Sequence, residues 1–327
     1  MKNKHVLVTG GTGFIGTALV KALTERGYQV RVLDNDFRGN RNRLKKLEDD
    51  VEIVSGDIRE EKSVLDAVQG IDIIYHLAAI NGTRYFYEIP DQVLDVNVRG
   101  ALNTIKACLV HNISRFVLAS SSEVYQTPSR IPTDESERIY IEDITNPRYS
   151  YAGSKIISEL LTLNCLRNKS THAIIFRPHN IYGPDMGNEH VIPELLRKIY
   201  IASEGFRKKK IQLKIQGSGE ESRAFCFIDN AIDAILICGE KGADGKIYHV
   251  GETRETRIRD LIRIIGDILC LEIEVTPGLA AVGGTPRRSP DVGKILKLGY
   301  DPQVSLEQGL EQTITWYVRR LGKKEKK

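Results

Sequence analysis

The chain lacks any uninterrupted apolar run of about 18 residues, the length that a membrane-spanning helix requires. Its first residues, Met1 to Lys4, lead directly into a short strand-like run, so the longer apolar core of a secretory signal is also missing. We therefore expect a soluble protein with no membrane association, and we expect it in the cytoplasm.

Paired cysteines are missing as well. The chain has 5 cysteines. None of them stands in a CxxC pair or near a histidine at metal-ligand spacing, and an odd number does not suit a disulfide framework. We therefore expect buried thiols and no metal site.

The chain has little net charge, because its 47 Lys and Arg residues are nearly balanced by 43 Asp and Glu residues. Two basic runs, Arg207–Lys210 and Lys323–Lys327, have no aromatic residues among them, whereas a nucleic-acid surface needs aromatic side chains for base stacking. We expect no nucleic-acid partner and interpret residues 321–327 as a basic tail.

The first half of the chain alternates short β-branched runs with helical patterns. The expected strands are His5–Thr9, Gln29–Leu33, Val51–Val54, Ile71–Tyr75, Arg115–Ala119 and Ala173–Phe176, and the expected helices are Phe14–Arg26, Glu60–Val68, Asp91–His111 and Tyr149–Leu166. Strands that are apolar throughout have no face in water, so they indicate a parallel sheet covered by helices on both sides. The pattern predicts an α/β fold with a Rossmann-type doubly wound parallel sheet.

Glycine and proline interrupt the pattern repeatedly after Pro178. We expect a smaller, loop-rich C-terminal α/β domain formed by residues 178–225 and 251–320. Residues 1–177, joined by about 226–250, form the first domain in this interpretation.

A glycine-rich turn follows the first expected strand. Gly10, Gly13 and Gly16 stand in G-x-x-G-x-x-G spacing, with Phe14 and Ile15 opening the first helix. Glycine permits positive φ and close approach of a pyrophosphate, whose charge meets the free N–H groups of the helix start. The order strand, turn, helix is that of a dinucleotide site.

An acidic residue, Asp34, stands where the second expected strand ends. Its carboxylate can accept hydrogen bonds from ribose hydroxyls and would repel a 2′-phosphate, which favours NAD over NADP. The alternative interpretation of Asp34 is a surface carboxylate at a strand end. The nearby Arg38, Arg41 and Arg43 could bind a 2′-phosphate, so NADP stays an alternative cofactor.

Two further strand ends fit the same ligand. Asp57, followed by Ile58, can present a carboxylate to the adenine amino group. Leu77, Ala78 and Ala79 follow the fourth strand, and side chains this small let a cofactor lie against backbone.

Tyr151 and Lys155 stand four residues apart, on one face of a helix. A Lys cation, together with a positive nicotinamide ring, lowers the pKa of a Tyr hydroxyl so that it acts as a general base. Ser121, at the end of the fifth strand, can hydrogen-bond the same substrate hydroxyl. The alternatives are a chance pair on an exposed helix and a serine-rich polar turn.

These motifs, with the later run Arg177–Pro184, together resemble the extended short-chain dehydrogenase/reductase family, specifically its nucleotide-sugar epimerases, decarboxylases and dehydratases. The resemblance covers roughly Lys4 to Tyr317. It implies a Rossmann domain that holds NAD, a smaller domain over a nucleotide-diphosphate sugar, and a homodimer formed by the helices Asp91–His111 and Tyr149–Leu166.

The resemblance also implies roles for single residues. Asn97 and Lys155 would contact the cofactor, and Pro178 would lie beside the nicotinamide. The residues that would bind substrate are Asn180, Arg223 and Arg288 at the diphosphate and Asp291 at the ribose. Arginine forks suit phosphate oxygens, although either arginine could instead form an exposed salt bridge.

The reaction depends on Ser122 and Glu123. A 4,6-dehydratase carries Asp and Glu at these positions, so the missing acid disfavours dehydration. A decarboxylase carries Thr-Ser-Glu and an arginine like Arg288, which Ser121–Glu123 fits, with Glu123 as a base or a positioning group. We prefer a 4-epimerase of UDP-hexoses or UDP-uronic acids, with Arg84 beside the sugar, and keep a non-catalytic NAD-binding sensor or scaffold as the alternative of another class.

Overall fold

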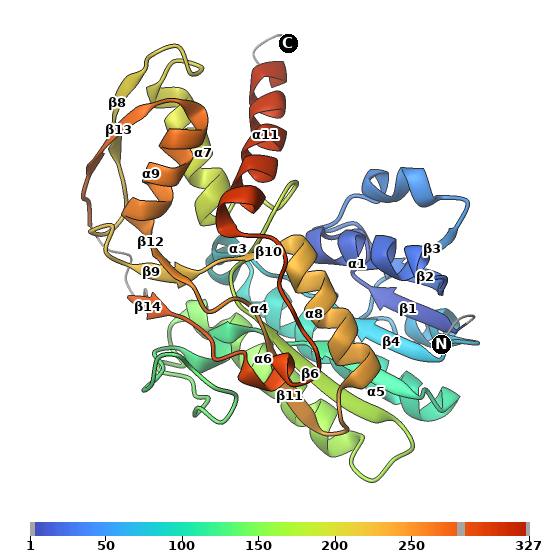
Figure 1. Cartoon of the computed structure of the whole chain (residues 1–327). Helices are drawn as coiled ribbons and strands as arrows, with labels where there is room; N and C mark the ends of the chain where they lie inside the picture. Colours follow the sequence, from blue (N-terminus) through green and yellow to red (C-terminus); the bar gives the residue numbers. More distant parts are fainter. Residues whose placement is uncertain (1–3, 280–284, 325–327) are drawn as a thin grey trace.

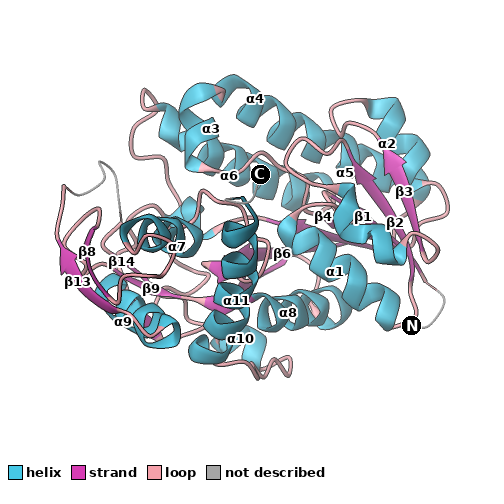
Figure 2. Cartoon of the chain, turned by 90° about the horizontal axis from the view of Figure 1, so that it is seen from above, coloured by secondary structure: helices cyan, strands magenta, loops and turns pink. Residues whose placement is uncertain are grey.

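The computed structural model describes residues 4–279 and 285–324. Its centre is a seven-stranded parallel sheet in the order β11-β6-β5-β4-β1-β2-β3 (Figures 1 and 2). The strands are β1 His5–Thr9, β2 Gln29–Asp34, β3 Val51–Ser55, β4 Ile73–His76, β5 Arg115–Ala119, β6 His172–Pro178 and β11 Lys246–Val250. This order confirms the predicted Rossmann-type fold, and the change of direction between β1 and β4 opens a crevice at their carboxyl ends.

Helices cover both faces of the sheet (Figure 2). One face carries α1 Phe14–Glu25 and α8 Ile228–Lys241, and the other carries α2 Glu61–Val68, α5 Gly100–His111 and α6 Ser150–Cys165. Alternate residues of β1 enter the two cores, because Val6 and Val8 pack with the first set and Leu7 with the second. This two-sided burial explains why the strands are apolar throughout.

The expected helix Asp91–His111 is interrupted. It consists of α4 Pro90–Leu94, a π-helical turn at Asp95–Arg99 and α5, and it follows the short helix α3 Thr83–Glu88. A π turn adds a residue to a helix and is frequent beside functional sites. Here the turn lies next to a hollow in the protein, which Val96 helps to line.

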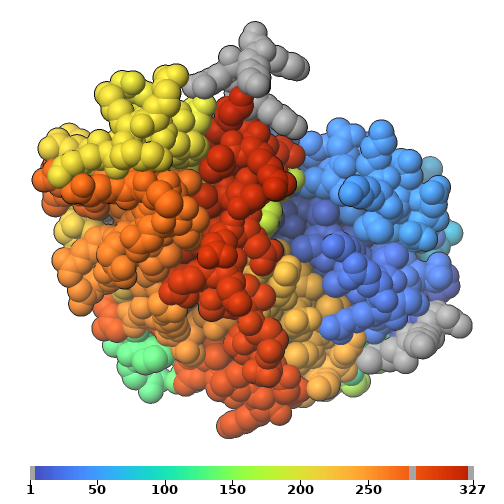
Figure 3. Space-filling model, turned by 45° about the horizontal axis from the view of Figure 1, so that its top comes forward, coloured from blue at the N-terminus to red at the C-terminus, as the bar shows by residue number. Residues whose placement is uncertain are grey.

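The second domain is more regular than the expected loop-rich one. It contains two small sheets and three long helices: β8 Lys210–Lys214, β9 Ser222–Ala224, β12 Glu255–Arg257, β13 Glu272–Thr276, β14 Arg287–Arg288, α7 Val191–Ala202, α9 Ile258–Leu269 and α11 Leu306–Lys324. The short strands β7 Ile181–Tyr182 and β10 Cys226–Phe227 pair beneath it. Figure 3 shows α11, in red, between this domain and the blue N-terminal part. The short helix α10 Gly293–Leu296 lies against β11 and α8 of the first domain.

The structure corrects two expectations, one about the basic tail and one about the cysteines. The basic tail 321–327 is part of α11 as far as Lys324, and its last three residues lie outside the described ranges. All five cysteines are free, but Cys270 is exposed and Cys165 is only half-buried, so not every thiol is packed in the core. No helix within residues 4–279 and 285–324 has the length and apolar character needed to cross a bilayer.

Apolar side chains are exposed on the outer side of α4, α5 and α6. Val110 is 64% and Leu160 is 55% exposed, and Leu94, Leu109 and Ile157 are exposed beside them. These are the helices on which the predicted homodimer depends, and the dimer stays a prediction.

Candidate active site

The turn between β1 and α1 approaches β4 so closely that only glycine fits. Gly10 has φ +74°, and a Cβ on it would lie 2.7 Å from the backbone nitrogen of Ala78. A Cβ on Gly16 would lie 2.1 Å from the carbonyl oxygen of Gly10. Gly13 begins α1 without a side-chain cap, which leaves the first N–H groups of the helix open to an anion. This cradle fits the predicted pyrophosphate.

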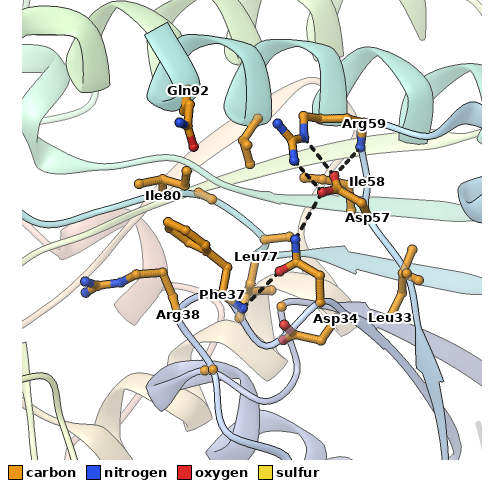
Figure 4. Close-up of a pocket in the computed structure, with 18 residues that line it drawn as sticks. Leu33, Asp34, Phe37, Arg38, Asp57, Ile58, Arg59, Leu77, Ile80 and Gln92 are labelled. Carbon is orange, nitrogen blue, oxygen red and sulfur yellow. Dashed lines mark hydrogen bonds and ion pairs between the residues drawn. The ribbon is translucent and has the colours of Figure 1, made fainter. Parts of the chain in front are cut away.

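Beside this turn lies a hollow, shown in Figure 4. Its lining includes the predicted residues Asp34, Asp57, Ile58, Leu77, Ala78 and Ala79, together with Phe37, Ile80 and Gln92. Asp34 is fixed at the wall because one carboxylate oxygen accepts from the backbone N–H of Thr12 at 3.0 Å and the other from that of Asp36 at 2.9 Å.

The Asp57 carboxylate accepts hydrogen bonds from other side chains of the protein. It accepts from the Arg59 guanidinium at 2.7 Å and from the Asn35 amide at 3.1 Å, as the dashed lines in Figure 4 show. The hydrogen bonds from Arg59 hold the pKa of Asp57 below its ordinary value. Asp57 therefore lines the hollow as an anion, and its contact with an adenine amino group stays a prediction.

The three arginines that kept NADP open all have carboxylate partners. Arg41 pairs with Asp36 at 2.5 Å, Arg38 with Glu189 at 3.2 Å and Arg43 with Asp185 at 2.8 Å. These carboxylates offset the positive charge that a 2′-phosphate would need, so the arrangement favours NAD.

Asn97 does not line any of the hollows along the cleft. It is buried, and its amide accepts from the backbone N–H of Ile80 at 2.9 Å and donates to the hydroxyl of Ser154 at 2.9 Å. A direct contact of Asn97 with the cofactor stays a prediction. In the protein alone, Asn97 fixes the backbone that follows β4 against α6.

A second hollow continues from the glycine turn to the start of α6. Phe14, Ile15, Gly16 and Pro178 line it together with Tyr151, Lys155 and the predicted serines Ser121 and Ser122. Tyr151 and Lys155 are both buried, and the Lys155 ammonium lies 5.7 Å from the centre of the Tyr151 ring. Lys155 donates to the carbonyl of Ala119 at 2.8 Å, and Phe86 stacks on Tyr151 with ring centres 5.0 Å apart.

The expected effect of Lys155 on Tyr151 is not found in the protein alone. Burial raises the pKa of Tyr151, and the hydrogen bond with Ser121 lowers it only in part. Burial also lowers the pKa of Lys155 to about 8. Removing both groups from water opposes the charged form of each, and the combined effect of Lys155 and a nicotinamide ring on the pKa of Tyr151 stays a prediction.

Glu123 and Arg288 form an ion pair at the far end of this hollow. Ser121 caps the short helical turn Ser122–Tyr125 by accepting from the backbone N–H of Glu123 at 3.1 Å. Burial alone would raise the pKa of Glu123, but Arg288, together with Arg148 and Arg223, outweighs burial and holds the pKa below its ordinary value. Arg288, expected at a diphosphate, is thus bound to a carboxylate in the hollow that Tyr151 and Lys155 also line.

A third hollow lies under the second domain and shares Glu123, Arg288 and Asn180 with the second. Arg223 lines it and donates to the backbone carbonyls of Ser222 and Thr285, both at 2.7 Å. The second hollow shares lining residues with the first and with the third, so the three form one continuous cleft.

Two predicted substrate residues lie outside the cleft. Arg84 is exposed and pairs with Glu88 at 3.0 Å, one turn along α3. Asp291 is exposed and accepts from the backbone N–H of Gly293 at 2.6 Å, at the start of α10. Their contacts with a substrate stay predictions. In the protein alone, Asp291 is held within its own local element, while Arg84 also lies 4.0 Å from Glu189, which lines the second of these hollows.

The sequence reasoning missed Arg148, which lines both the second and the third hollow. It stands three residues before Tyr151, and this proximity was a usable signal. It also missed a buried ion pair beneath the site, where Arg177 and Glu159 are 2.6 Å apart and their side chains are each 3% exposed. No group of acidic, histidine or cysteine side chains suited to a metal occurs in the described part of the chain.

Comparisons with known proteins agree on one family. Residues 6–251 match the model of the NAD dependent epimerase/dehydratase family. The chain is 28% identical to a UDP-N-acetyl-alpha-D-glucosaminuronate decarboxylase of Bacillus cytotoxicus, over 96% of this chain and 98% of that one. It is 29% identical to a putative UDP-glucose 4-epimerase of Methanocaldococcus jannaschii, over 95% and 97% of the two chains.

Solved structures agree with this. The UDP-N-acetylglucosamine 4-epimerase of Methanobrevibacter ruminantium has a TM-score of 0.88 at 25% identity and covers 98% of this chain and 100% of its own. A dTDP-glucose 4,6-dehydratase of Streptomyces venezuelae, solved with NAD bound, has a TM-score of 0.85 at 29% identity, with coverage of 97% and 98%.

Proposed function

Because the chain belongs to the NAD-dependent epimerase/dehydratase family of nucleotide-sugar enzymes, we propose that it is a UDP-sugar 4-epimerase. Its cofactor is NAD, as in related structures solved with NAD. When bound, NAD accepts a hydride from the sugar C4 and returns it.

Three side chains of the chain handle the C4 hydroxyl. Tyr151 takes the hydroxyl proton and gives it back, and Ser121 hydrogen-bonds the same oxygen. Lys155 places a cation 5.7 Å from the Tyr151 ring, and NAD, when bound, would supply a second positive charge that favours the ionised phenol. The loss of one proton and one hydride leaves a 4-keto sugar. Hydride return to the opposite face of C4 gives the epimer.

The similarity to UDP-sugar 4-epimerases carries the choice of reaction, and the Glu123–Arg288 ion pair argues against dehydration. A 4,6-dehydratase needs an acid that protonates the leaving hydroxyl and a base that removes the C5 proton. Glu123 is held ionised by Arg288, so it is no acid, and the same ion pair weakens it as a base. The remaining proton-handling groups, Tyr151 and Ser121, suffice for oxidation and reduction at C4.

Decarboxylation of a UDP-uronic acid is the second candidate. A 4-keto uronic acid is a β-keto acid that loses carbon dioxide readily, so the same first step leads to either product. The run Ser121–Glu123, bonded to Arg288, favours this candidate, as does the similarity to the Bacillus cytotoxicus decarboxylase.

Product analysis distinguishes the candidates. The purified protein with NAD is incubated with UDP-glucose, UDP-glucuronate and dTDP-glucose, and the products are followed by NMR. We expect C4 epimers with the carbon count unchanged. Carbon dioxide release from UDP-glucuronate would identify a decarboxylase, and a 4-keto-6-deoxy product would identify a dehydratase. Bound NAD without any turnover would favour a non-catalytic sensor.

A further inference from the structure

A network of buried polar side chains lies beneath the cleft and reaches from the first domain to the second. Glu159 on α6 accepts from Arg177 on β6 with both carboxylate oxygens, at 2.8 and 2.6 Å. Arg177 also donates to the hydroxyl of Tyr125 at 2.5 Å, and this hydroxyl lies 2.6 Å from Nε2 of His249 on β11. Nδ1 of His249 lies 2.9 Å from the backbone carbonyl of Asp291. Each of the four side chains is at most 2% exposed, so water is a poor substitute for these hydrogen bonds.

The direction of each hydrogen bond at His249 follows from its partners. A backbone carbonyl only accepts, so Nδ1 carries a proton and donates it to Asp291. Burial lowers the pKa of His249 to about 4, so the ring is neutral and its Nε2 carries no proton. Tyr125 therefore donates to Nε2, while its oxygen accepts from Arg177. Removing the Tyr125 hydroxyl would leave a buried acceptor on His249 without its donor.

The two ends of the Tyr125–His249 hydrogen bond belong to the segments that carry Glu123 and Arg288. Tyr125 is the last residue of the short helical turn that contains Glu123. Asp291, which His249 holds, follows Arg288 by three residues. Tyr125 itself lines none of the three hollows. The hydrogen bond thus joins, beneath the cleft, the two pieces of chain whose side chains meet in the ion pair.

The surroundings of His249 keep this connection rigid. The ring of His179 packs edge-on against that of His249, with ring centres 4.6 Å apart. On the other side of the connection, the backbone of Thr133 donates to the carbonyl of Ser289 at 2.8 Å and accepts from the N–H of Asp291 at 2.7 Å. A buried polar network whose members are all paired fixes one arrangement of the segments that it joins.

We propose that Tyr125 is a positioning residue, whose hydrogen bond to His249 sets the geometry of the ion pair in the cleft. The strength of this ion pair depends on the distance and alignment of the facing atoms, which belong to two domains. Without the buried connection, the two segments can shift against each other and the pair weakens. The effect on the ion pair is independent of the proposed function, whereas the effect on substrate binding rests on it.

A double-mutant cycle measures the ion pair directly. The coupling between Glu123→Gln and Arg288→Gln is determined by urea denaturation, once in the wild type and once with Tyr125→Phe. We expect a coupling of about 10-fold in the unfolding equilibrium constant in the wild type, and of less than about 3-fold with Tyr125→Phe. Tyr28→Phe is the matched control, because its buried hydroxyl donates to Glu240 within the first domain, and it should keep the full coupling. An equal coupling with and without the Tyr125 hydroxyl would overturn the proposal.

Variants of His249 separate positioning from a general loss of structure. His249→Gln keeps an acceptor, its amide oxygen, and should keep most of the coupling, whereas His249→Leu should lose as much as Tyr125→Phe. The double variant Tyr125→Phe/His249→Leu should lose no more coupling than either single variant, because both changes remove the same hydrogen bond. Additive losses would contradict the proposal. If Tyr125→Phe fails to fold, His249→Gln against His249→Leu makes the same comparison.

Calorimetry measures the consequence for binding. UDP is titrated into the NAD-loaded protein, and NAD is titrated into the NAD-free protein. Tyr125→Phe should weaken UDP binding by about 10-fold, the usual effect of one misaligned hydrogen bond to a charged group, because Arg288 is expected at the diphosphate. The Kd for NAD should change by less than about 3-fold, since the glycine turn that cradles it is remote from the network. A similar loss for both ligands would show a general loss of structure and overturn the proposal.

The two proposals fail differently. A wild type that does not bind UDP contradicts the assignment as a UDP-sugar enzyme, while the double-mutant cycle still decides the role of Tyr125. A wild type that binds UDP, with a Tyr125→Phe variant that binds it equally well, overturns the positioning role and leaves the assignment in place.

Discussion

Removing the Lys155 ammonium should change how the stability of the NAD-free protein depends on pH. Burial lowers the pKa of Lys155 from 10.5 to about 8. Between these values the unfolded chain holds a proton that the folded protein has released, so the free energy of unfolding rises with pH across this window. At about 1.4 kcal/mol per pH unit, the rise from this one group is about 3 kcal/mol.

Urea denaturation of the wild type and Lys155→Met, from pH 7 to 10.5, measures this difference. Other groups titrate in both proteins, so the wild-type value minus the variant value isolates Lys155. That difference should increase by about 3 kcal/mol over the window. Lys21→Met, which removes an ammonium whose side chain is 66% exposed, should give a flat difference. A flat difference for Lys155→Met as well would refute the buried-cation account.

Three further changes test other parts of the account. Gly16→Ala places a Cβ 2.1 Å from a backbone carbonyl and should weaken NAD binding by about 10- to 100-fold, while Gly322→Ala, with open space around it, should not change it in the same titration. Glu159→Gln leaves the buried Arg177 uncompensated and should lower the free energy of unfolding in urea by about 3–5 kcal/mol. Val110→Asp places a charge on the exposed apolar face of α5 and should shift a homodimer to monomer in sedimentation, and a monomeric wild type would contradict the predicted dimer.

The first domain could be predicted because its burial is local and two-sided. The strand His5–Thr9 was expected with the bounds that the structure has, since each of its core residues is apolar whichever face it enters. The α/β alternation then restricts the topology to very few arrangements.

The second domain could be predicted less well because its pairings are distant. Ile211 and Leu213 alternate with exposed residues in β8, yet β8 pairs with β13, some 60 residues later, and no local pattern reports such a pairing. Helix α9 was visible in principle, because Leu261, Ile262 and Ile265 recur at helical spacing and are buried.

In the candidate site, too, contacts between residues close in the chain could be predicted and contacts between distant residues could not. Tyr151 and Lys155 share a helix, so their spacing alone predicts that they lie together. Glu123 and Arg288 are 165 residues apart in the chain and meet only through the packing of two domains. Their ion pair, which decides how Glu123 can act, had no signal in the sequence.

The central claim is that Tyr151 moves the proton of the C4 hydroxyl, and Tyr151→Phe tests it most directly. The variant keeps the ring that stacks on Phe86 and loses only the hydroxyl. With the substrate identified by NMR, we expect kcat to fall by about 10²- to 10⁴-fold. The calorimetric Kd for that substrate should change by less than about 3-fold, since the lost hydrogen bond is one of many in the complex. A variant with unimpaired turnover would contradict the account.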